Sequence, residues 1–538
     1  MSVSSHVVPV SVLLSLAMLL SPLTPVRAHD DDAAASKVPL QLGKVTFQNT
    51  CSPAVQPKFE RSVALLHSFW FNEAEKAFGD VLKQDPTCAI ATWGIATVRI
   101  GNTFAGNATP ADAKAAQEAI ARGRSIGAKS EREKGYIEAV AAYWDHYAEP
   151  HGARMQALSR SFEALAARLP QDDEAQIFSA IYLTAIQSPT DKTFASTLKA
   201  AGMLEPLLVK YPEHPGVAHY LIHSYDYPSI AAKGVPAAKL YSKIAPSAPH
   251  ALHMPSHIFT RVGAWAESAE TNRRSADTSV KERSSGDQLH ALDYLVYANL
   301  QLGRDNEARA AIEEAKTASS LNPDARQIWY AVSAMPARYA VERGMWKEAA
   351  SLEPRASRFS FATAMTLYAK ALGAARSGDR GIAESATNEL GEIAKNLRQM
   401  KDDYWATEVR VQYLGAQAWT AYAAGKRDEA LALMRQAADL EDTSEKNAVS
   451  PGRLIPAREL LGDMLLESGK PADALAEYEQ SQVRDPNRLR GLYGAGLAAS
   501  QAGDKAKAKL YFTRVAALTS GSSSRPELSK VREFLAVN

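Results

Sequence analysis

Apolar side chains recur along this chain at the three- and four-residue spacing that is typical of helices with one buried face. The helix-sized segments follow one another almost to the C-terminus, and short turns rich in Gly, Pro, Asp and Asn separate them. No stretch has the alternating, β-branched pattern that predicts a series of strands. The pattern therefore predicts an all-α protein.

One short motif recurs where two predicted helices meet, and it combines a turn, several polar residues and a small Ala. Its copies are FWFNEAEKAF at 69–78, LGRDNEA at 302–308, AGKRDEA at 424–430, SGKPADA at 468–474 and AGDKAKA at 502–508. Asp-Pro follows the first and fourth copies and would end the helical unit. Such repetition indicates helical hairpins that bury their apolar faces by stacking on their neighbours.

These segments resemble the tetratricopeptide-repeat (TPR) family, and the units between residues 457 and 518 resemble it most closely. The resemblance covers roughly two-thirds of the chain, and residues 101–213 are helical but have no assigned register. It implies a right-handed α-solenoid of stacked TPR hairpins, whose first helices line a concave, ligand-holding groove. The family carries no activity of its own, so the function depends on the residues in the groove.

The N-terminal residues are predicted to lie outside this fold. Residues 7–20 form a short apolar run, and Val26-Arg27-Ala28 has the small residues of a cleavage site. We therefore expect a periplasmic or secreted protein with no membrane span after signal cleavage. The predicted regions are a signal peptide at 1–28, a flexible leader at 29–50, an N-terminal helical region at 51–214, histidine-rich units at 215–318 and a C-terminal array at 319–538.

Histidine is concentrated in one part of the chain. Seven of the 12 histidines lie within residues 214–290, and none follows that window. Two pairs are four residues apart, namely His219 with His223 and His253 with His257. On a helix this spacing puts both rings on one face, close enough to chelate one ion. The pairs are offset by 34 residues, which is one TPR unit, so we expect them to lie side by side.

A third helix extends this patch. Counting back from the turn glycines at 263 and 303 places His290 in the repeat position of His250, and Asp293 in that of His253. In TPR proteins these positions commonly face the groove. We therefore predict a transition-metal site with the ligands His219, His223, His253 and His257 and the accessory ligands His250, His290 and Asp293.

Neutral imidazoles with one carboxylate suit zinc, copper or iron, and they argue against calcium and magnesium. Zinc or copper is favoured in an exported protein, and iron stays open. The donors would form one closed site or hold two neighbouring ions, and a dinuclear centre would allow oxidative or hydrolytic catalysis. Asp226 or Asp293 would be a ligand or would orient a ligating ring. The chain has no HExxH, GxSxG or phosphate-loop motif, so the sequence leaves catalysis open.

Other interpretations need no metal. The histidines would then form hydrogen bonds within the groove, bind an anion or sense pH. An adaptor would use the groove for an envelope protein, a peptide or a small molecule, and a metal store or chaperone would have no turnover. Pro255 lies inside the second pair and either bends its helix or begins a new one. We interpret His67, in the first unit, as a packing residue.

Charge and cysteine content complete the expectations. The chain has 61 basic and 60 acidic residues, so we expect no nucleic-acid partner. Its only two cysteines are Cys51 and Cys88. In an oxidising compartment this pair predicts a disulfide, and the alternative is two buried thiols.

Overall fold

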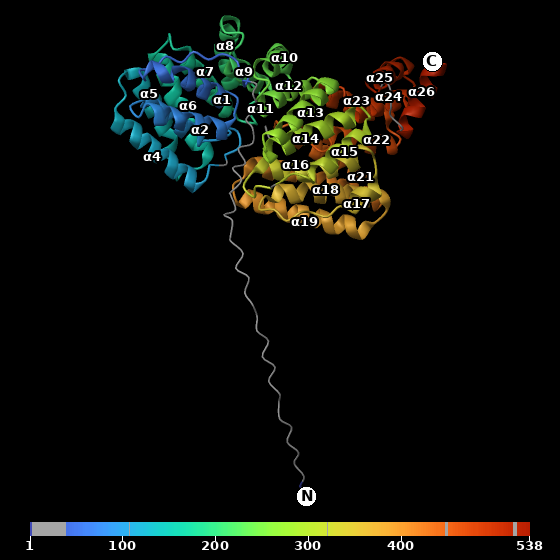
Figure 1. Cartoon of the computed structure of the whole chain (residues 1–538). Coiled ribbons are helices and arrows are strands. Elements are labelled where there is room, and N and C mark those ends of the chain that lie inside the picture. Colours follow the sequence, from blue (N-terminus) through green and yellow to red (C-terminus); the bar gives the residue numbers. More distant parts are fainter. Residues whose placement is uncertain (3–38, 107, 320, 447–449, 520–524) are drawn as a thin grey trace. The chain divides into compact units, whose positions relative to one another are not determined.

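A computed structural model describes residues 1–2, 39–106, 108–319, 321–446, 450–519 and 525–538 (Figure 1). Residues 41–538 form one compact unit, which contains all of the described helices. Nearly all of the predicted signal peptide and residues 29–38 of the predicted leader lie outside the described residues. Every regular element in the described parts is a helix, which confirms the predicted all-α solenoid.

The N-terminal helices are amphipathic segments that pack against their sequence neighbours. They are a 3₁₀ turn at Pro53–Val55, α1 (Gln56–His67), α2 (Phe71–Gln84), α3 (Ile90–Val98), α4 (Pro110–Ile126), α5 (Glu131–Trp144), α6 (His151–Arg168), α7 (Asp173–Ala185) and α8 (Ala195–Lys210).

The central helices carry the clustered histidines. They are α9 (Pro215–Tyr225), a 3₁₀ turn at Ala231–Gly234, α10 (Val235–Ile244), α11 (Pro249–His253), α12 (Pro255–Arg261), α13 (Trp265–Lys281), α14 (Ser285–Gln301) and α15 (Asp305–Ala315).

The C-terminal helices continue the array as further hairpins. They are α16 (Arg326–Glu342), α17 (Trp346–Ala350), α18 (Ser360–Ser377), α19 (Arg380–Gln399), α20 (Asp403–Ala423), α21 (Arg427–Glu441), α22 (Ala457–Glu467), α23 (Pro471–Arg484), α24 (Leu489–Gln501), α25 (Lys505–Leu518) and α26 (Pro526–Val537).

The hairpins of the central and C-terminal helices turn in the same way. From the α12–α13 turn onward, the turn of each hairpin contains a glycine in the left-handed region of backbone conformation, where a side chain would be strained, as at Gly303 (φ +68°) and Gly425 (φ +82°). The small residue of the repeated motif then packs between the two helices. Ala308 and Ala430, for example, have no exposed surface. Turn and small residue together explain why the motif recurs at these positions.

The predicted flexible leader of residues 29–50 is wrong for its second half. Phe47 is fully buried, and its ring lies 5.2 to 5.4 Å from the rings of Phe59, Trp93 and Tyr136. The backbone N–H of Lys44 also donates to the carbonyl of Glu213 at 2.9 Å. Leu42 and Val45 are buried as well, so three apolar side chains anchor this short segment in the core.

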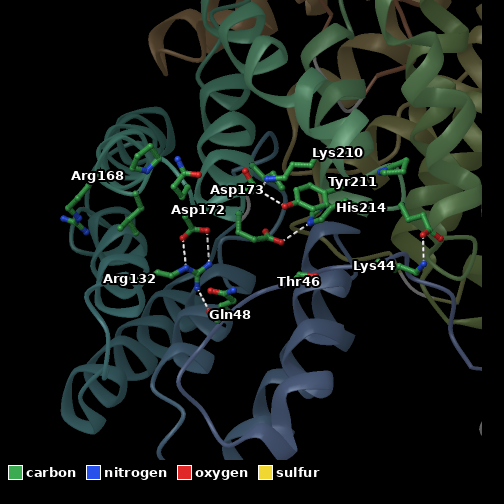
Figure 2. Close-up of a pocket in the computed structure, with 17 residues that line it drawn as sticks. Lys44, Thr46, Gln48, Arg132, Arg168, Asp172, Asp173, Lys210, Tyr211 and His214 are labelled. Atoms are coloured by element: carbon green, nitrogen blue, oxygen red, sulfur yellow. Dashed lines mark hydrogen bonds and ion pairs between the residues drawn. The ribbon is translucent and has the colours of Figure 1, made fainter.

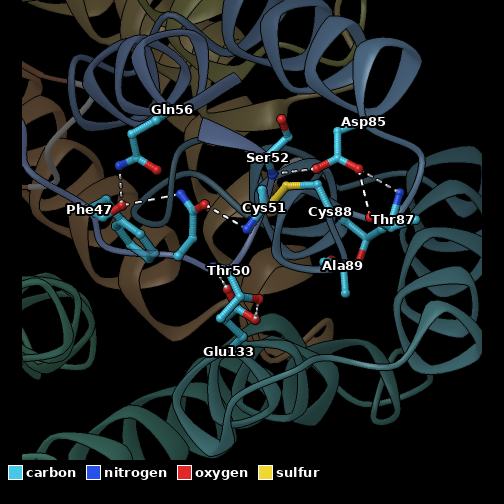
Figure 3. Close-up of a disulfide and its surroundings, with 12 residues drawn as sticks. Phe47, Thr50, Cys51, Ser52, Gln56, Asp85, Thr87, Cys88, Ala89 and Glu133 are labelled. Atoms are coloured by element: carbon cyan, nitrogen blue, oxygen red, sulfur yellow. Dashed lines mark hydrogen bonds between the residues drawn. A yellow bond between two sulfur atoms is a disulfide. The ribbon is translucent and has the colours of Figure 1, made fainter. Parts of the chain in front are cut away.

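Cys51 and Cys88 form a disulfide, as predicted, with Cα atoms 4.7 Å apart (Figure 3). It ties the segment before α1 to the residues that precede α3. The backbone N–H of Ser52 donates to the carboxylate of Asp85 at 2.7 Å beside it. Asp85 and the two sulfur atoms lie close together, but both sulfurs are committed to the covalent bond.

The C-terminal units pack back against the central ones. The indole N–H of Trp265 donates to the carbonyl of Asn487 at 2.7 Å, and the backbone N–H of Leu489 donates to the amide oxygen of Gln301 at 2.9 Å. A Cβ atom at Gly263 would lie only 2.4 Å from the carbonyl oxygen of Pro486, so only glycine fits this turn. Contacts between segments more than 180 residues apart therefore hold the central units in place.

We expect Cys51→Ser/Cys88→Ser to lower the free energy of unfolding of the N-terminal units by about 2–4 kcal/mol, because the bond closes a long loop. Thermal melting and hydrogen exchange of α1–α3 would measure the change. A reductant should destabilise the unsubstituted protein in the same way and leave the variant unaffected. Equal stability of the two proteins without reductant would contradict the prediction.

Candidate metal centre

The structure brings six of the seven predicted ligands into two groups of three histidines. In each group one nitrogen from every ring lies within 4.8 Å of the other two. We call them trio 1, which is His219, His223 and His250, and trio 2, which is His253, His257 and His290.

Trio 1 joins two neighbouring hairpins. His219 and His223 lie one turn apart on α9, and His250 lies on α11. The Nε2 atom of His219 is 3.1 Å from the Nε2 atoms of both His223 and His250. Three Nε2 atoms therefore meet at one point. His219 and His223 are buried, and His250 is half-buried.

Trio 2 repeats this arrangement one unit later. His253 ends α11, His257 lies on α12, and their Nε2 atoms are 3.1 Å apart. The two helices separate at Met254, which keeps helical dihedral angles, so Pro255 begins α12 without changing the spacing of the pair. His290, on α14, completes the trio with its ring centroid 4.4 Å from that of His253.

The grouping differs from the predicted one. We expected the two pairs to lie side by side as a single patch, whereas each pair instead takes its third member from the following hairpin. His250 approaches His219 more closely than it does His253, whose ring centroid is 6.1 Å away. The trios nevertheless adjoin, because the rings of His223 and His257 are 6.0 Å apart.

Hydrogen bonds at Nδ1 determine which nitrogen is free in three of the six rings. Nδ1 of His219 lies 2.7 Å from the main-chain carbonyl of His67, which can only accept, so this nitrogen carries the proton. Nδ1 of His253 donates to the amide oxygen of Asn272 at 2.7 Å. Nδ1 of His257 donates to the carboxylate of Asp226 at 2.9 Å. In the neutral rings Nε2 is then a bare lone pair, directed into the trio.

Two unprotonated nitrogens whose lone pairs face each other repel, unless a positive charge lies between them. The Nε2 atoms of His253 and His257 are 3.1 Å apart, and neither carries a hydrogen in the neutral rings. For a cation bound at the usual distance of about 2.0–2.1 Å from each nitrogen, the N–metal–N angle would be roughly 100°. Burial, together with neighbouring histidines, holds the pKa of His253 well below its ordinary value, so protonation is disfavoured as the source of that charge.

The sequence left open whether Asp226 is a ligand or orients a ligating ring. In the structure its carboxylate orients the ring of His257. One carboxylate oxygen accepts from His257 and from Nζ of Lys446 (3.0 Å), and the other accepts from Nε of Arg261 (2.9 Å). Burial would raise the pKa of Asp226, but Lys446 and Arg261 outweigh it and hold that pKa well below its usual range. The ionised carboxylate therefore fixes the ring of His257 from behind.

Aromatic rings surround the trios. The rings of Phe69 and Phe104 stack on His250 (5.2 Å) and His223 (4.3 Å), and Tyr241 stacks on His219 at 5.0 Å. The ring of Tyr294 lies between 4.7 and 5.1 Å from those of His253 and His257. The surroundings of both trios are therefore apolar on several sides.

Asp293 is not among the clustered ligands. Its carboxylate accepts a 2.5 Å hydrogen bond from Nη1 of Arg338, and both side chains are fully buried. The structure thus does not place Asp293 with either trio, because its carboxylate is directed toward Arg338 of α16. The carboxylate that we assigned to a metal forms an ion pair with Arg338 of the next hairpin.

Sequence reasoning missed a further buried group next to trio 1. The carboxylate of Glu174 accepts from Nε2 of His67 (3.0 Å) and from Nε2 of His214 (2.9 Å). Nδ1 of His67 accepts from the hydroxyl of Tyr220, and Nδ1 of His214 accepts from the backbone N–H of Val217. Every ring nitrogen of this group is satisfied, so it needs no metal. The packing interpretation of His67 agrees with its full burial.

The described residues of the connection between α21 and α22 contact groups beside trio 2, which the open groove expected of this family does not predict. From this connection Lys446 reaches Asp226, and the carbonyl of Ser450 accepts from the hydroxyl of Tyr294 at 3.0 Å. The same hydroxyl lies 3.4 Å from Nε2 of His257. Nothing in the sequence pattern marked residues so far from the histidines in the chain.

A cavity of about 690 Å³ lies elsewhere (Figure 2). It is lined by the segment at residues 44–48, by residues of α5 to α8 and by residues 211–214. Its charged side chains largely neutralise one another, since Arg132 pairs with Asp172 and Lys210 pairs with Asp173, both at 2.6 Å. None of the six clustered histidines lines it. We therefore regard the trios as the stronger candidate site.

The hairpin turns and the buried small residue of each motif decide the type of fold. The chain is a helical-repeat protein of the TPR type. No model of a known protein family matches the sequence, and no curated protein matches it. No helix in the described parts of this TPR-type chain has both the length and the apolar character needed to cross a membrane.

Solved structures with a related helical architecture include a TPR protein from Parabacteroides merdae, which is 16% identical with a TM-score of 0.29 over 54% of this chain and 98% of that one. Human IFIT1 with m7Gppp-AAAA is 12% identical, with a TM-score of 0.36 over 80% and 90% of the two chains. Human IFIT1 with PPP-AAAA is 9% identical, with a TM-score of 0.35 over 80% and 91%.

These neighbours correct the expectation of no nucleic-acid partner. That exclusion rested on a balanced net charge, yet IFIT1 proteins are seen with capped and triphosphate-bearing oligonucleotides. A helical-repeat protein can therefore hold nucleic acid, and net charge does not rule this out. Similarity at this level gives no argument that the present chain does so.

We expect Asp293→Asn to leave bound metal unchanged and to lower the free energy of unfolding by about 2 kcal/mol, because it weakens a charged hydrogen bond to buried Arg338. Elemental analysis and thermal melting would measure the two effects. Loss of metal from a folded Asp293→Asn variant would restore this residue as a ligand and contradict our assignment.

Proposed function

We propose that this TPR-type chain is a metalloprotein that holds two neighbouring transition-metal ions, one in each histidine trio, with copper as the favoured metal. The observation that carries the proposal is the pair of bare Nε2 atoms of His253 and His257, 3.1 Å apart. Their Nδ1 protons are held by Asn272 and Asp226, so a hydrogen bond between the two neutral rings is excluded.

Repetition strengthens the proposal. Trio 1 has the same composition, which is an i,i+4 pair and one histidine from the next hairpin, and His219 is held by a main-chain acceptor. Three protein ligands leave at least one position open on a four-coordinate ion. Two such ions in adjoining trios are typical of centres that bind and transform a small ligand, and not of closed structural sites.

The charge of the surroundings favours copper. All six ligands are neutral, and the charges of Asp226 and Glu445 are balanced by those of Arg261 and Lys446 nearby. No carboxylate is left to offset the ions themselves. Two Zn²⁺ ions would add four positive charges to a buried region, whereas two Cu⁺ ions would add only two. Imidazole suits copper well, and divalent copper also exceeds zinc in affinity for such ligands.

Other metals fit the donors less well. Iron in oxygenases is commonly held by two histidines and a carboxylate, and neither trio contains a carboxylate among the described residues. Calcium and magnesium require oxygen ligands. Zinc stays the alternative, and it would support a hydrolytic centre through a bound hydroxide.

A peptide-binding adaptor is less well supported at this place. The trio histidines are buried or half-buried, and the α21–α22 connection bonds to Asp226 and Tyr294 across them. A peptide would have to displace that connection to reach the histidines. The proposal of an exported protein is supported by the disulfide Cys51–Cys88, since such bonds persist in oxidising compartments.

We expect the purified full chain to bind two copper ions, because each trio completes one three-nitrogen site. His223→Ala, in trio 1, and His290→Ala, in trio 2, should each lose one ion, and the double variant should lose both. Elemental analysis after loading with Cu⁺, Zn²⁺ or Fe²⁺ would give the stoichiometry and the preference.

His146→Ala is the matched control, because this histidine is about half exposed and lies outside both trios. Circular dichroism should show that each variant is folded. Folded variants that keep two ions would sink the proposal, and so would a full chain that binds none after reconstitution. Preferential, tighter binding of zinc would overturn the choice of copper alone.

A further inference from the structure

We infer that the two trios bind dioxygen between two cuprous ions and reduce it to a bridging peroxide. The inference rests on the proposed dicopper centre and adds the substrate and the electron count. It is carried by four features of the site, which are the open coordination positions, the adjoining trios, the balance of charge and the apolar surroundings.

The trios lie close enough to share one small ligand. The ring of His257 is 6.0 Å from that of His223 in trio 1 and 6.3 Å from that of His290 in its own trio. Neighbouring rings within a trio are 4.4–6.3 Å apart, so the two trios adjoin with a spacing toward the upper end of that range. Ions in two-metal sites are commonly about 3.5–4 Å apart, which a diatomic bridge spans.

The charge of the buried centre stays constant in this reaction. Two Cu⁺ ions carry two positive charges, and two Cu²⁺ ions with one peroxide dianion carry two as well. Each copper loses one electron, and dioxygen gains both to become O₂²⁻, so no proton or other reactant is required. The neighbouring charges of Asp226, Arg261 and Lys446 are fixed in ion pairs and need not change. A buried site resists changes in net charge because the surroundings solvate charge poorly.

The same argument disfavours an oxidised centre with no bridging anion. Two bare Cu²⁺ ions would raise the charge by two, close to the cationic Nζ of Lys446, which is itself buried. Lys446 is thus a positioning residue for Asp226 that also disfavours additional positive charge in trio 2. A dianion placed between the ions removes this penalty in one step.

The surroundings of the trios favour a small, apolar reactant. Phe69 and Phe104 stack over two rings of trio 1, and Tyr294 lies against trio 2. The cavities of about 690 Å³ and 420 Å³ are lined by other residues and not by the trio histidines. Dioxygen is neutral and apolar, so such surroundings accommodate it without loss of hydration.

The test uses the full chain loaded with Cu⁺ without oxygen and then exposed to dioxygen. We expect uptake of one dioxygen for every two copper ions, with a new charge-transfer absorption and no electron paramagnetic resonance signal from isolated Cu²⁺. Resonance Raman spectra with mixed-isotope dioxygen should show one O–O stretch, as expected for a symmetric bridge.

His290→Ala is the decisive variant, because it should keep the copper of trio 1 and take up no dioxygen as a bridged peroxide. His146→Ala should behave like the unsubstituted chain. Two bound coppers with no dioxygen uptake, or with isolated Cu²⁺ signals from one-electron oxidation, would overturn the inference and leave the metal centre intact. A chain that binds no copper at all would overturn both proposals.

Discussion

Control of the Nδ1 protons is the interaction on which the candidate site depends. Three acceptors of different kinds, which are the carbonyl of His67, the amide of Asn272 and the carboxylate of Asp226, each hold one imidazole proton. Each acceptor is itself fixed, because Asn272 donates to Ser268 and Asp226 pairs with Arg261. Without these bonds the rings could exchange protons and form ordinary hydrogen bonds with one another. With them, lone pairs converge in a buried region.

The helical repeat brings the histidines together with only a few residues specified in the sequence. One helical turn places two histidines on one face, and one 34-residue offset presents a second pair on the next unit. These local rules were sufficient to predict the all-α repeat fold, the hairpin turns and the proximity of six histidines. They were not sufficient to divide those histidines into their two groups. That division depends on how far one hairpin is rotated relative to the next, which places His250 nearer to His219 than to His253.

The remaining errors have one common cause, which is contact between residues far apart in the sequence. Asp293 was assigned to the metal from its repeat position alone. Its ion-pair partner Arg338 lies on another hairpin, and the local pattern gave no sign of it. Residues 41–50 were taken as a leader because their composition gave no sign that Phe47 enters the core. Glu174, Phe104 and Lys446 contribute to the site from segments with no periodic signal pointing toward it. Local patterns cannot report partners of this kind.

The contacts made by the connection between α21 and α22 have a consequence for the order in which the site is assembled during synthesis. All six histidines precede residue 291, whereas Lys446, which closes over Asp226, follows it by 220 positions. As the chain is made from its N-terminus, the residues of both trios exist long before Lys446 and Ser450. During that interval Asp226 and Tyr294 lack the partners that later bond to them from the α21–α22 connection. If the trios hold metal as we propose, loading is therefore easiest before the last hairpins have folded.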